Sequence, residues 1–157
     1  MLGKLSELQI ERFLESQIVG RIGCHANGET YVVPISYAYD GTYIYAHTYE
    51  GKKLDMMREE PRICFEVDTL RDLSEWKSVI GWGEFEELKD PDERKHALQI
   101  LMDRNLPILS SVTMHLSPDW PFHSDDTDYT DGVVFRIKLV DKTGRFETNV
   151  ASPAFAG

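Results

Sequence analysis

Hydrophobic positions follow a helical spacing in two stretches of the chain. Ser6 and Gln9 have the spacing of a capping box, and the apolar residues after them recur every three or four positions, which predicts an amphipathic helix over residues 6–16. Asp90 is a typical N-cap residue, and the proline and acidic residues that follow it suit a first helical turn. The pattern therefore predicts a second helix over residues 90–104.

Between these helices the hydrophobic pattern is mostly that of β-strands. An apolar run at 19–26 is followed by two strand-like segments on either side of Asp40-Gly41, which is a strong hairpin signal. We therefore expect residues 30–48 to form an antiparallel hairpin. Pro34 lies inside its first arm and has no N–H to donate to a ladder, so that strand should lie at a sheet edge or carry a bulge.

Alternation at 62–68, 76–88 and 132–146 predicts three more strands, and residues 51–60 read as a short helix that ends before a proline. This order contains many antiparallel strands and too few helical crossovers for a doubly wound sheet. The expected fold class is therefore mainly β (β+α), a small antiparallel β-barrel with peripheral helices.

Size and composition point to one domain. The chain has 157 residues, of which 41% are hydrophobic and 28% are charged, as in ordinary globular proteins. We expect a single domain over residues 1–157, with barrel strands within 19–88 and 132–146. The segment 105–131 is expected to be irregular, and residues 147–157 are expected to form a loose tail.

The expected location is the cytoplasm. The sequence has no apolar run long enough to cross a membrane, and its first residues lack the pattern of a signal peptide. The two cysteines, Cys24 and Cys64, lie in apolar runs and are expected to be buried, reduced thiols.

The charge balance limits the possible partners. A formal net charge of −10 at pH 7 repels nucleic acid and anionic lipid, so we expect neither as a partner. One stretch reverses the charge locally, since Lys52, Lys53, Arg58 and Arg62 lie close together. Such a cluster suits an anion site, but acidic residues lie among these positions and an exposed helix face is the alternative.

The basic cluster coincides with the start of the short helix. His47 and Thr48 end the preceding strand, and the chain then turns through a glycine into a helix whose first N–H groups have no intrahelical partner. Such a start attracts anions, and Lys52 or Lys53 would add positive charge. The hypothesis from the residues alone is a site for a phosphorylated cofactor.

The strand at 76–88 is a second candidate for ligand contact. Alternation places Ser78, Ile80 and Trp82 on one face, with Trp76 at the head of the strand. Large rings beside a hydroxyl could stack against a ligand, while core or dimer packing is the ordinary role of such tryptophans.

No metal-binding or catalytic motif accompanies these features. His115 and His123 lack the spacing of paired zinc ligands, and the sequence contains neither a phosphate-binding glycine loop nor a nucleophile elbow. We therefore assign no metal site and no catalytic residue from the sequence.

A family resemblance is carried by three stretches: GRIGCHANGETYVVPISYAYDGTYIYAHTYEGKKLDMMREEPRICFEVD, WKSVIGWGEFEELKDPDER and VVFRIKLVDKTGRF. They resemble the pyridoxamine 5′-phosphate oxidase-related family of FMN-binding split barrels, and most closely its nitroimidazole-resistance-protein-like branch. The strand proline, the histidine-threonine pair, the basic pair and the tryptophan-serine strand occur in the family's order. The resemblance covers about Leu8 to Phe146 and implies a small antiparallel split β-barrel.

The resemblance also implies a homodimer with two FMN molecules at its interface, each held mainly by one chain and completed by the other. The implied FMN-binding residues are Val33, Pro34, Ile35 and Ser36 along the ring and ribityl chain, His47 and Thr48 near the phosphate, Lys52 and Lys53 at the phosphate, and Trp76 and Ser78 from the partner chain.

The activity implied is that of an FMN-dependent oxidoreductase that reduces a small aromatic, nitro or quinone-like compound with an external electron donor. The oxidase proper has an arginine-lysine pair and basic substrate ligands near its C-terminus, whereas this chain has Lys52-Lys53 and ends in RFETNVASPAFAG, so pyridoxamine 5′-phosphate is not the expected substrate. The alternatives are a non-catalytic flavin-binding or flavin-sensing module, a haem-binding or haem-degrading protein, and use of the deazaflavin F420. The segment LSPDWPFH, with Trp120, could cover the pocket or be an ordinary packed loop.

Overall fold

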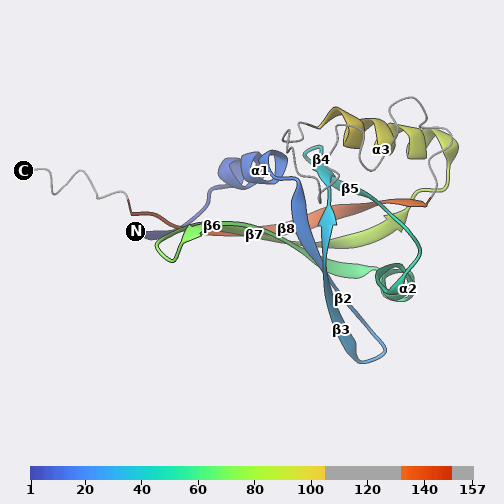
Figure 1. The fold of residues 1–157 in the computed structure, drawn as a ribbon, viewed down its shortest axis with the longest axis horizontal. Coiled ribbons are helices and arrows are strands. Elements are labelled where there is room, and N and C mark those ends of the chain that lie inside the picture. Colours follow the sequence, from blue (N-terminus) through green and yellow to red (C-terminus); the bar gives the residue numbers. More distant parts are fainter. Residues whose placement is uncertain (105–131, 150–157) are drawn as a thin grey trace, which may run out of the picture.

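The computed structural model describes residues 1–104 and 132–149, which form one antiparallel sheet with three helices around it (Figure 1). The strands follow the order β3-β2-β6-β7-β8-β5-β4, and β1 pairs with the end of β8. The strands are β1 (Leu2–Lys4), β2 (Val19–Ala26), β3 (Glu29–Ser36), β4 (Ala38–Tyr39), β5 (Tyr43–Thr48), β6 (Arg62–Asp72), β7 (Glu75–Glu87) and β8 (Val133–Glu147). The helices are α1 (Glu7–Ser16), α2 (Lys52–Glu59) and α3 (Pro91–Asp103). The expected fold class, mainly β with peripheral helices, is confirmed.

The sheet curls around two hydrophobic clusters. In Figure 1, α1 and α3 lie on one side of the long strands β6, β7 and β8, and α2 and the β2–β3 turn lie on the other. β3 stands at one end of the strand order and also contacts β5 near the other end, so the sheet curls towards closure. The main cluster includes Leu14, Phe65 and Phe135, and a second one packs Leu98 and Leu101 of α3 against β5 and β8.

The helices begin where their cap residues place them. The Ser6 hydroxyl accepts a hydrogen bond from the Gln9 N–H at 3.2 Å, and the Gln9 side chain accepts one from the Ser6 N–H at 2.8 Å. The Asp90 carboxylate accepts from the Glu93 N–H at 3.1 Å at the start of α3. These cap contacts, reciprocal at Ser6 and Gln9 and single at Asp90, satisfy N–H groups that a helix start leaves without a partner, as the sequence predicts.

The predicted hairpin over residues 30–48 is wrong in its pairing. β3 pairs along its whole length with β2, from Glu29 opposite Ala26 to Ser36 opposite Val19. The turn around Asp40-Gly41 does form, but it joins only the two residues of β4 to β5, and β5 pairs mainly with β8.

Two local features explain this pairing. Asn27 and Gly28 have φ values of 52° and 75°, the left-handed conformation that a two-residue hairpin turn requires at both positions, so the tighter turn joins β2 to β3. At the other end of β3, the fully buried Tyr37 directs its hydroxyl to the carbonyl of Leu14 in α1 at 2.7 Å. Tyr37 is thus held against α1, and β3 ends at Ser36, before the Asp40 turn begins.

Pro34 lies on a strand at the end of the strand order, as expected from its missing N–H. It stands opposite Arg21 of β2, and β2 is the only ladder partner of β3 in the described part of the chain. One backbone edge of β3 is therefore left without ladder partners among the described strands.

The chain ends differ from expectation where the structure describes them. The three-residue strand β1 was not predicted, and it pairs with the last residues of β8. The Thr148 N–H then donates to the Met1 carbonyl at 2.9 Å, so residues 147–149 are not a loose tail. The expected irregular segment 105–131, the remaining tail residues 150–157, and the positions His115, Trp120 and His123 lie outside the described residues. Across residues 1–104 and 132–149, every helix is too short or too polar to cross a membrane.

Candidate functional site

Alternate positions of five neighbouring strands share one exposed face of the sheet. The strand registers place Val32, Gly23, Cys64 and Trp82 in one row across β3, β2, β6 and β7. A parallel row contains Pro34, Arg21, Glu66 and Ile80. We call this surface the open sheet face. Val32, Trp82 and Val140 keep 63%, 43% and 69% of their surface exposed, so its middle is apolar.

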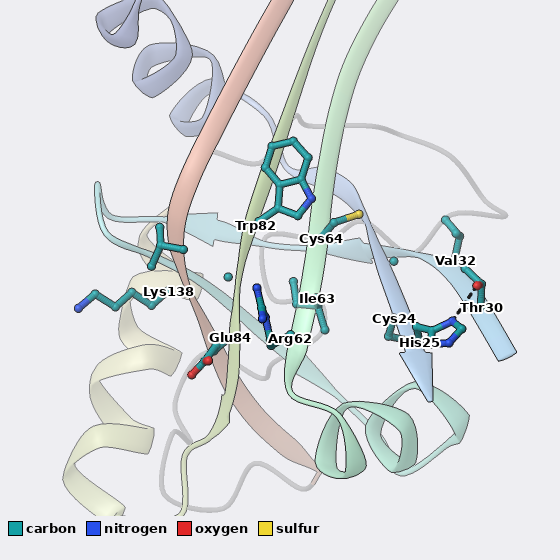
Figure 2. Close-up of a pocket in the computed structure, with 13 residues that line it drawn as sticks. Cys24, His25, Thr30, Val32, Arg62, Ile63, Cys64, Trp82, Glu84 and Lys138 are labelled. Atoms are coloured by element: carbon teal, nitrogen blue, oxygen red, sulfur yellow. Dashed lines mark hydrogen bonds between the residues drawn. The ribbon is translucent and has the colours of Figure 1, made fainter. Parts of the chain in front are cut away.

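The open sheet face holds a shallow pocket of about 520 Å³ (Figure 2). Figure 2 shows Trp82 and Cys64 side by side on neighbouring strands, with Arg62 and Glu84 further along the same two strands. The lining residues are Gly23, Cys24, His25, Thr30, Val32, Arg62, Ile63, Cys64, Trp82, Gly83, Glu84, Lys138 and Val140. None of the ten residues predicted to bind FMN is among them, so this pocket is a separate feature of the face.

The predicted ring-binding residues are divided between the two faces of β3. Val33 and Ile35 point towards the main cluster, while Pro34 and Ser36 alternate with them on the other face. The backbone of this segment runs along the strand edge that has no described ladder partner. The strand thus offers backbone N–H and C=O groups, more than side chains, to a ligand.

Trp76 and Ser78, predicted to act from the partner chain, lie on β7. The Trp76 indole N–H donates to the Glu147 carboxylate at 3.0 Å, and the Ser78 hydroxyl lies 3.4 Å from the Glu66 carboxylate. The registers place Ser78 three strands away from Ser36, which is about 14 Å at the usual strand spacing. Within one chain, therefore, Trp76 and Ser78 are separated from the other predicted residues.

The remaining predicted residues gather where β5 leads into α2. We call His47, Thr48, Gly51, Lys52 and Lys53 the β5–α2 corner. The His47 ring packs edge-on against Tyr49 at 5.4 Å between ring centres, and the Thr48 hydroxyl donates a long hydrogen bond of 3.4 Å to the Tyr49 carbonyl. Gly51 is the N-cap of α2 and provides no side chain to bond to the first helical N–H groups.

The two lysines of the corner have different surroundings. The Lys52 ammonium forms an ion pair with Glu29 at the start of β3 and lies 5.2 Å from the centre of the Tyr31 ring. Lys53 is partly buried, and burial lowers the pKa of its ammonium group. No ion pair of Lys53 with any residue of the described ranges is found. The corner therefore holds one neutralised cation and one that is partly desolvated and lacks a described counter-ion.

This donor set fits a phosphate group. Uncapped N–H groups at a helix start, a half-buried ammonium and a hydroxyl with one long hydrogen bond are the donors that a phosphate monoester accepts from. The sequence predicts a phosphate site at this corner, and that site stays a prediction. The sequence alone does not distinguish Lys53 from Lys52, because Glu29, the partner of Lys52, lies 23 positions earlier at the start of β3.

One residue of interest escaped the sequence prediction. Arg104, the C-cap residue of α3, donates from one guanidinium nitrogen to the Ser36 hydroxyl at 2.6 Å and to the Tyr37 carbonyl at 2.9 Å. Its Nε atom is buried without a hydrogen-bond partner, and burial lowers the pKa of the guanidinium to about 10. No sequence signal indicates this contact, since the two partners are 68 positions apart.

No cluster of three or more His, Cys, Asp or Glu side chains suited to a metal ion occurs within residues 1–104 and 132–149. Cys24 and Cys64 are both free thiols, Cys24 buried and Cys64 half-buried. Cys24 faces the core and Cys64 the open sheet face.

Comparison with known proteins places this geometry in a family. A curated relative, an uncharacterised protein of Rhizobium meliloti (strain 1021), is 32% identical over 87 residues, which are 53% of this chain. The match spans 58% of that relative's length.

Solved structures share the fold over nearly the whole chain. A FAD-binding protein from Mesorhizobium loti has a TM-score of 0.70 at 31% identity, with 94% of this chain and 99% of that chain covered. A candidate 5-nitroimidazole antibiotic resistance protein from Bacteroides thetaiotaomicron has a TM-score of 0.68 at 21% identity, covering 93% and 87%. A FAD-binding protein from Mycobacterium smegmatis has a TM-score of 0.63 at 21% identity, covering 92% and 97%.

The model of the pyridoxamine 5′-phosphate oxidase family matches residues 6–146 of this chain. This match confirms the family resemblance inferred from the sequence. The chain belongs to the pyridoxamine 5′-phosphate oxidase family.

Proposed function

We propose that this chain binds FMN along β3 and uses it to reduce small aromatic, nitro or quinone-like compounds with electrons from an external donor. The observation that carries the proposal is the β5–α2 corner, where Lys53 is partly buried at an uncapped helix start without a described counter-ion. Partial desolvation of an ammonium group costs free energy unless an anion accompanies it, and a cofactor phosphate would supply that anion.

The chain's own residues have separate tasks in this proposal. Lys53, the first N–H groups of α2 and the Thr48 hydroxyl hold the phosphate. The backbone edge of β3 from Val33 to Ser36, which has no ladder partner among the described strands, lines the ribityl chain and ring and orients them. The bound flavin supplies the electron transfer, while the protein supplies position, electrostatics and exclusion of water.

A flavin rather than another cofactor is supported by the family and by the printed names of two similar structures, which are FAD-binding proteins. We favour FMN over FAD because the corner offers a single available cation. FAD carries a second phosphate and an adenosine, and Lys52 is already paired with Glu29. One phosphate matches one partly desolvated lysine.

The proposal includes a homodimer formed through the open sheet face. Its apolar middle, made of Val32, Trp82 and Val140, is the kind of exposed patch that marks an interaction site. Since Trp76 and Ser78 are about 14 Å across the sheet from β3 within one chain, only a second chain would bring them to the flavin. A two-fold interface uses the same patch on both chains, as this arrangement requires.

Turnover tests the activity separately from binding. FMN-loaded protein is mixed with NADH or NADPH and with a nitroaromatic or quinone acceptor, and acceptor reduction is compared with that by the same concentration of free FMN. We expect faster reduction by the protein. Tight FMN binding with no gain over free FMN would contradict the oxidoreductase and favour the flavin-sensing module, and a haem spectrum on adding haemin would favour the haem alternative.

A further inference from the structure

Arg104 is held against the end of the strand that the proposal assigns to the flavin ring. The residue follows α3, and its guanidinium reaches back to the Ser36 hydroxyl at 2.6 Å and the Tyr37 carbonyl at 2.9 Å. It also lines a pocket of about 440 Å³ between the end of α1, β4 and the end of α3. Figure 1 shows α1, β4 and α3 close together on one side of the long strands.

The positive charge of Arg104 has no counter-ion among the described residues. None of the ion pairs in residues 1–104 and 132–149 includes this guanidinium, and its buried Nε–H lacks an acceptor. Asp103 lies next to it in sequence but accepts a hydrogen bond from Gln99 at 2.8 Å. Arginine stays protonated at neutral pH even when burial lowers its pKa, so a positive charge is fixed at this end of β3.

The bond to Ser36 sets the direction of that hydroxyl's own proton. A serine hydroxyl has one hydrogen to donate and two lone pairs that accept. Because Arg104 occupies a lone pair of Ser36, the hydroxyl hydrogen is left to donate elsewhere. A hydroxyl that accepts a hydrogen bond from a guanidinium is polarised, and it is therefore a stronger hydrogen-bond donor to its own acceptor.

The two ends of β3 therefore carry different cations. Glu29 at its start pairs with Lys52 of the β5–α2 corner, and Ser36 at its end contacts Arg104. Ser36 is seven positions after Glu29, or about 23 Å along an extended strand. A ligand whose phosphate lies at the first end would direct its ring towards the second.

We infer that Arg104 is a positioning residue that acts through Ser36 to stabilise the reduced form of the flavin. This inference rests on the proposed function. The reduced ring carries more negative charge than the oxidised ring, so a fixed cation and a polarised hydroxyl at the ring end of β3 favour it. Arg104 thus raises the reduction potential of the bound cofactor without contacting the phosphate.

The test measures the midpoint potential of bound FMN in wild-type protein and in Arg104→Gln by equilibration with a redox dye. We expect the preference for reduced over oxidised flavin to fall about tenfold in Arg104→Gln, which is about 30 mV more negative for a two-electron couple. Arg104→Lys, which keeps the charge, should recover part of the shift. Ser36→Ala should also make the potential more negative. The double variant should differ little from Arg104→Gln alone, because the two residues act through the same contact.

Two controls separate this role from structural and phosphate-binding roles. Arg136→Gln removes a positive charge that is already paired with Glu86 and should leave the potential unchanged. The ratio of FMN to riboflavin affinity should stay constant in Arg104→Gln, since riboflavin lacks only the phosphate. If Arg104→Gln does not fold, Ser36→Ala carries the test.

The possible results separate the inference from the function on which it rests. An unchanged potential in FMN-loaded Arg104→Gln and Ser36→Ala would overturn the inference and leave FMN binding intact. A changed FMN-to-riboflavin ratio would assign Arg104 to the phosphate instead and would also overturn it. Wild-type protein that binds no flavin would refute the proposed function first.

Discussion

At the scale of single residues, the proposed phosphate site depends on a difference between two adjacent lysines. Lys52 is paired with Glu29 and Lys53 has no described ion pair, although both belong to one basic cluster in the sequence. The sequence identifies the pair because a helix start and its flanking charges are local features. It does not separate them, because Glu29 reaches Lys52 only through the pairing of β3 with β2. Arg104 is hidden for the same reason, since its contacts are with residues 67 and 68 positions away.

Replacing Lys53 should weaken phosphate binding more than replacing Lys52. Lys53→Ala is expected to lower FMN affinity about tenfold or more, because a charge-assisted hydrogen bond contributes roughly 1.5–3 kcal/mol. Lys52→Ala should have a smaller effect, since Glu29 already shares that charge. Fluorescence titration with FMN and with riboflavin checks this, and riboflavin affinity should not change.

Lys89→Ala, at an exposed lysine after β7, is the matched control for loss of one positive charge. Equal losses of FMN affinity in the Lys89 and Lys53 variants would mean that long-range charge, and not a direct contact, governs FMN binding. Unchanged FMN affinity in Lys53→Ala would remove Lys53 from the site.

At the scale of elements, the starts of α1 and α3 can be predicted from the sequence, whereas the pairing of the strands cannot. Ser6, Gln9 and Asp90 act on their own first helical turn, so their spacing was enough to predict where α1 and α3 begin. The partner of β3 depends on which of two turns forms the hairpin. Asn27-Gly28 and Asp40-Gly41 are equally strong hairpin signals in the sequence, so the sequence does not decide between them. The three residues of β1 carry too little pattern to predict a strand that only the end of β8 completes.

The Asn27-Gly28 turn should be sensitive to backbone conformation alone. Gly28 has φ of +75°, and no atom beyond its own chain neighbours lies within 4 Å of where a Cβ would be, so a substitution there meets strain but no clash. Gly28→Val should lower the free energy of unfolding by about 1–2 kcal/mol, the usual cost of a left-handed residue. Gly28→Asn should lose much less, because asparagine tolerates this conformation. Thermal unfolding of the two variants compares them directly, and equal stabilities would argue against the turn as described.

At the scale of the whole molecule, one exposed apolar face separates two halves of the predicted site. Trp82 of this face lies on β7, the same strand as Trp76 and Ser78, and strands β2 and β6 separate β7 from the predicted ring-contacting residues of β3. The sequence suggested that these strands take part, but only the register shows that they are three strands apart. Family membership could be predicted because the motifs lie in order along the chain, whereas the size of this gap depends on the pairing of all four strands.

A charge placed on the open sheet face should prevent association. Trp82→Lys is expected to convert a dimer into a monomer, because a lysine ammonium would be buried without a partner at the interface. Leu73→Lys, at an 88% exposed position between β6 and β7, is the control and should remain dimeric. Sedimentation velocity distinguishes the two states. A dimer that survives Trp82→Lys, or a monomeric wild type, would place the second chain's contribution in doubt.

The central claim, that this chain holds FMN by its phosphate, is tested most directly by the ligand that the purified protein carries. The visible absorption spectrum is recorded, the ligand is released by heat, and its mass is measured. The account predicts two broad flavin bands and the mass of FMN, with about one FMN for each chain. A released mass of FAD, a haem or deazaflavin spectrum, or a colourless protein that does not bind added FMN would contradict it.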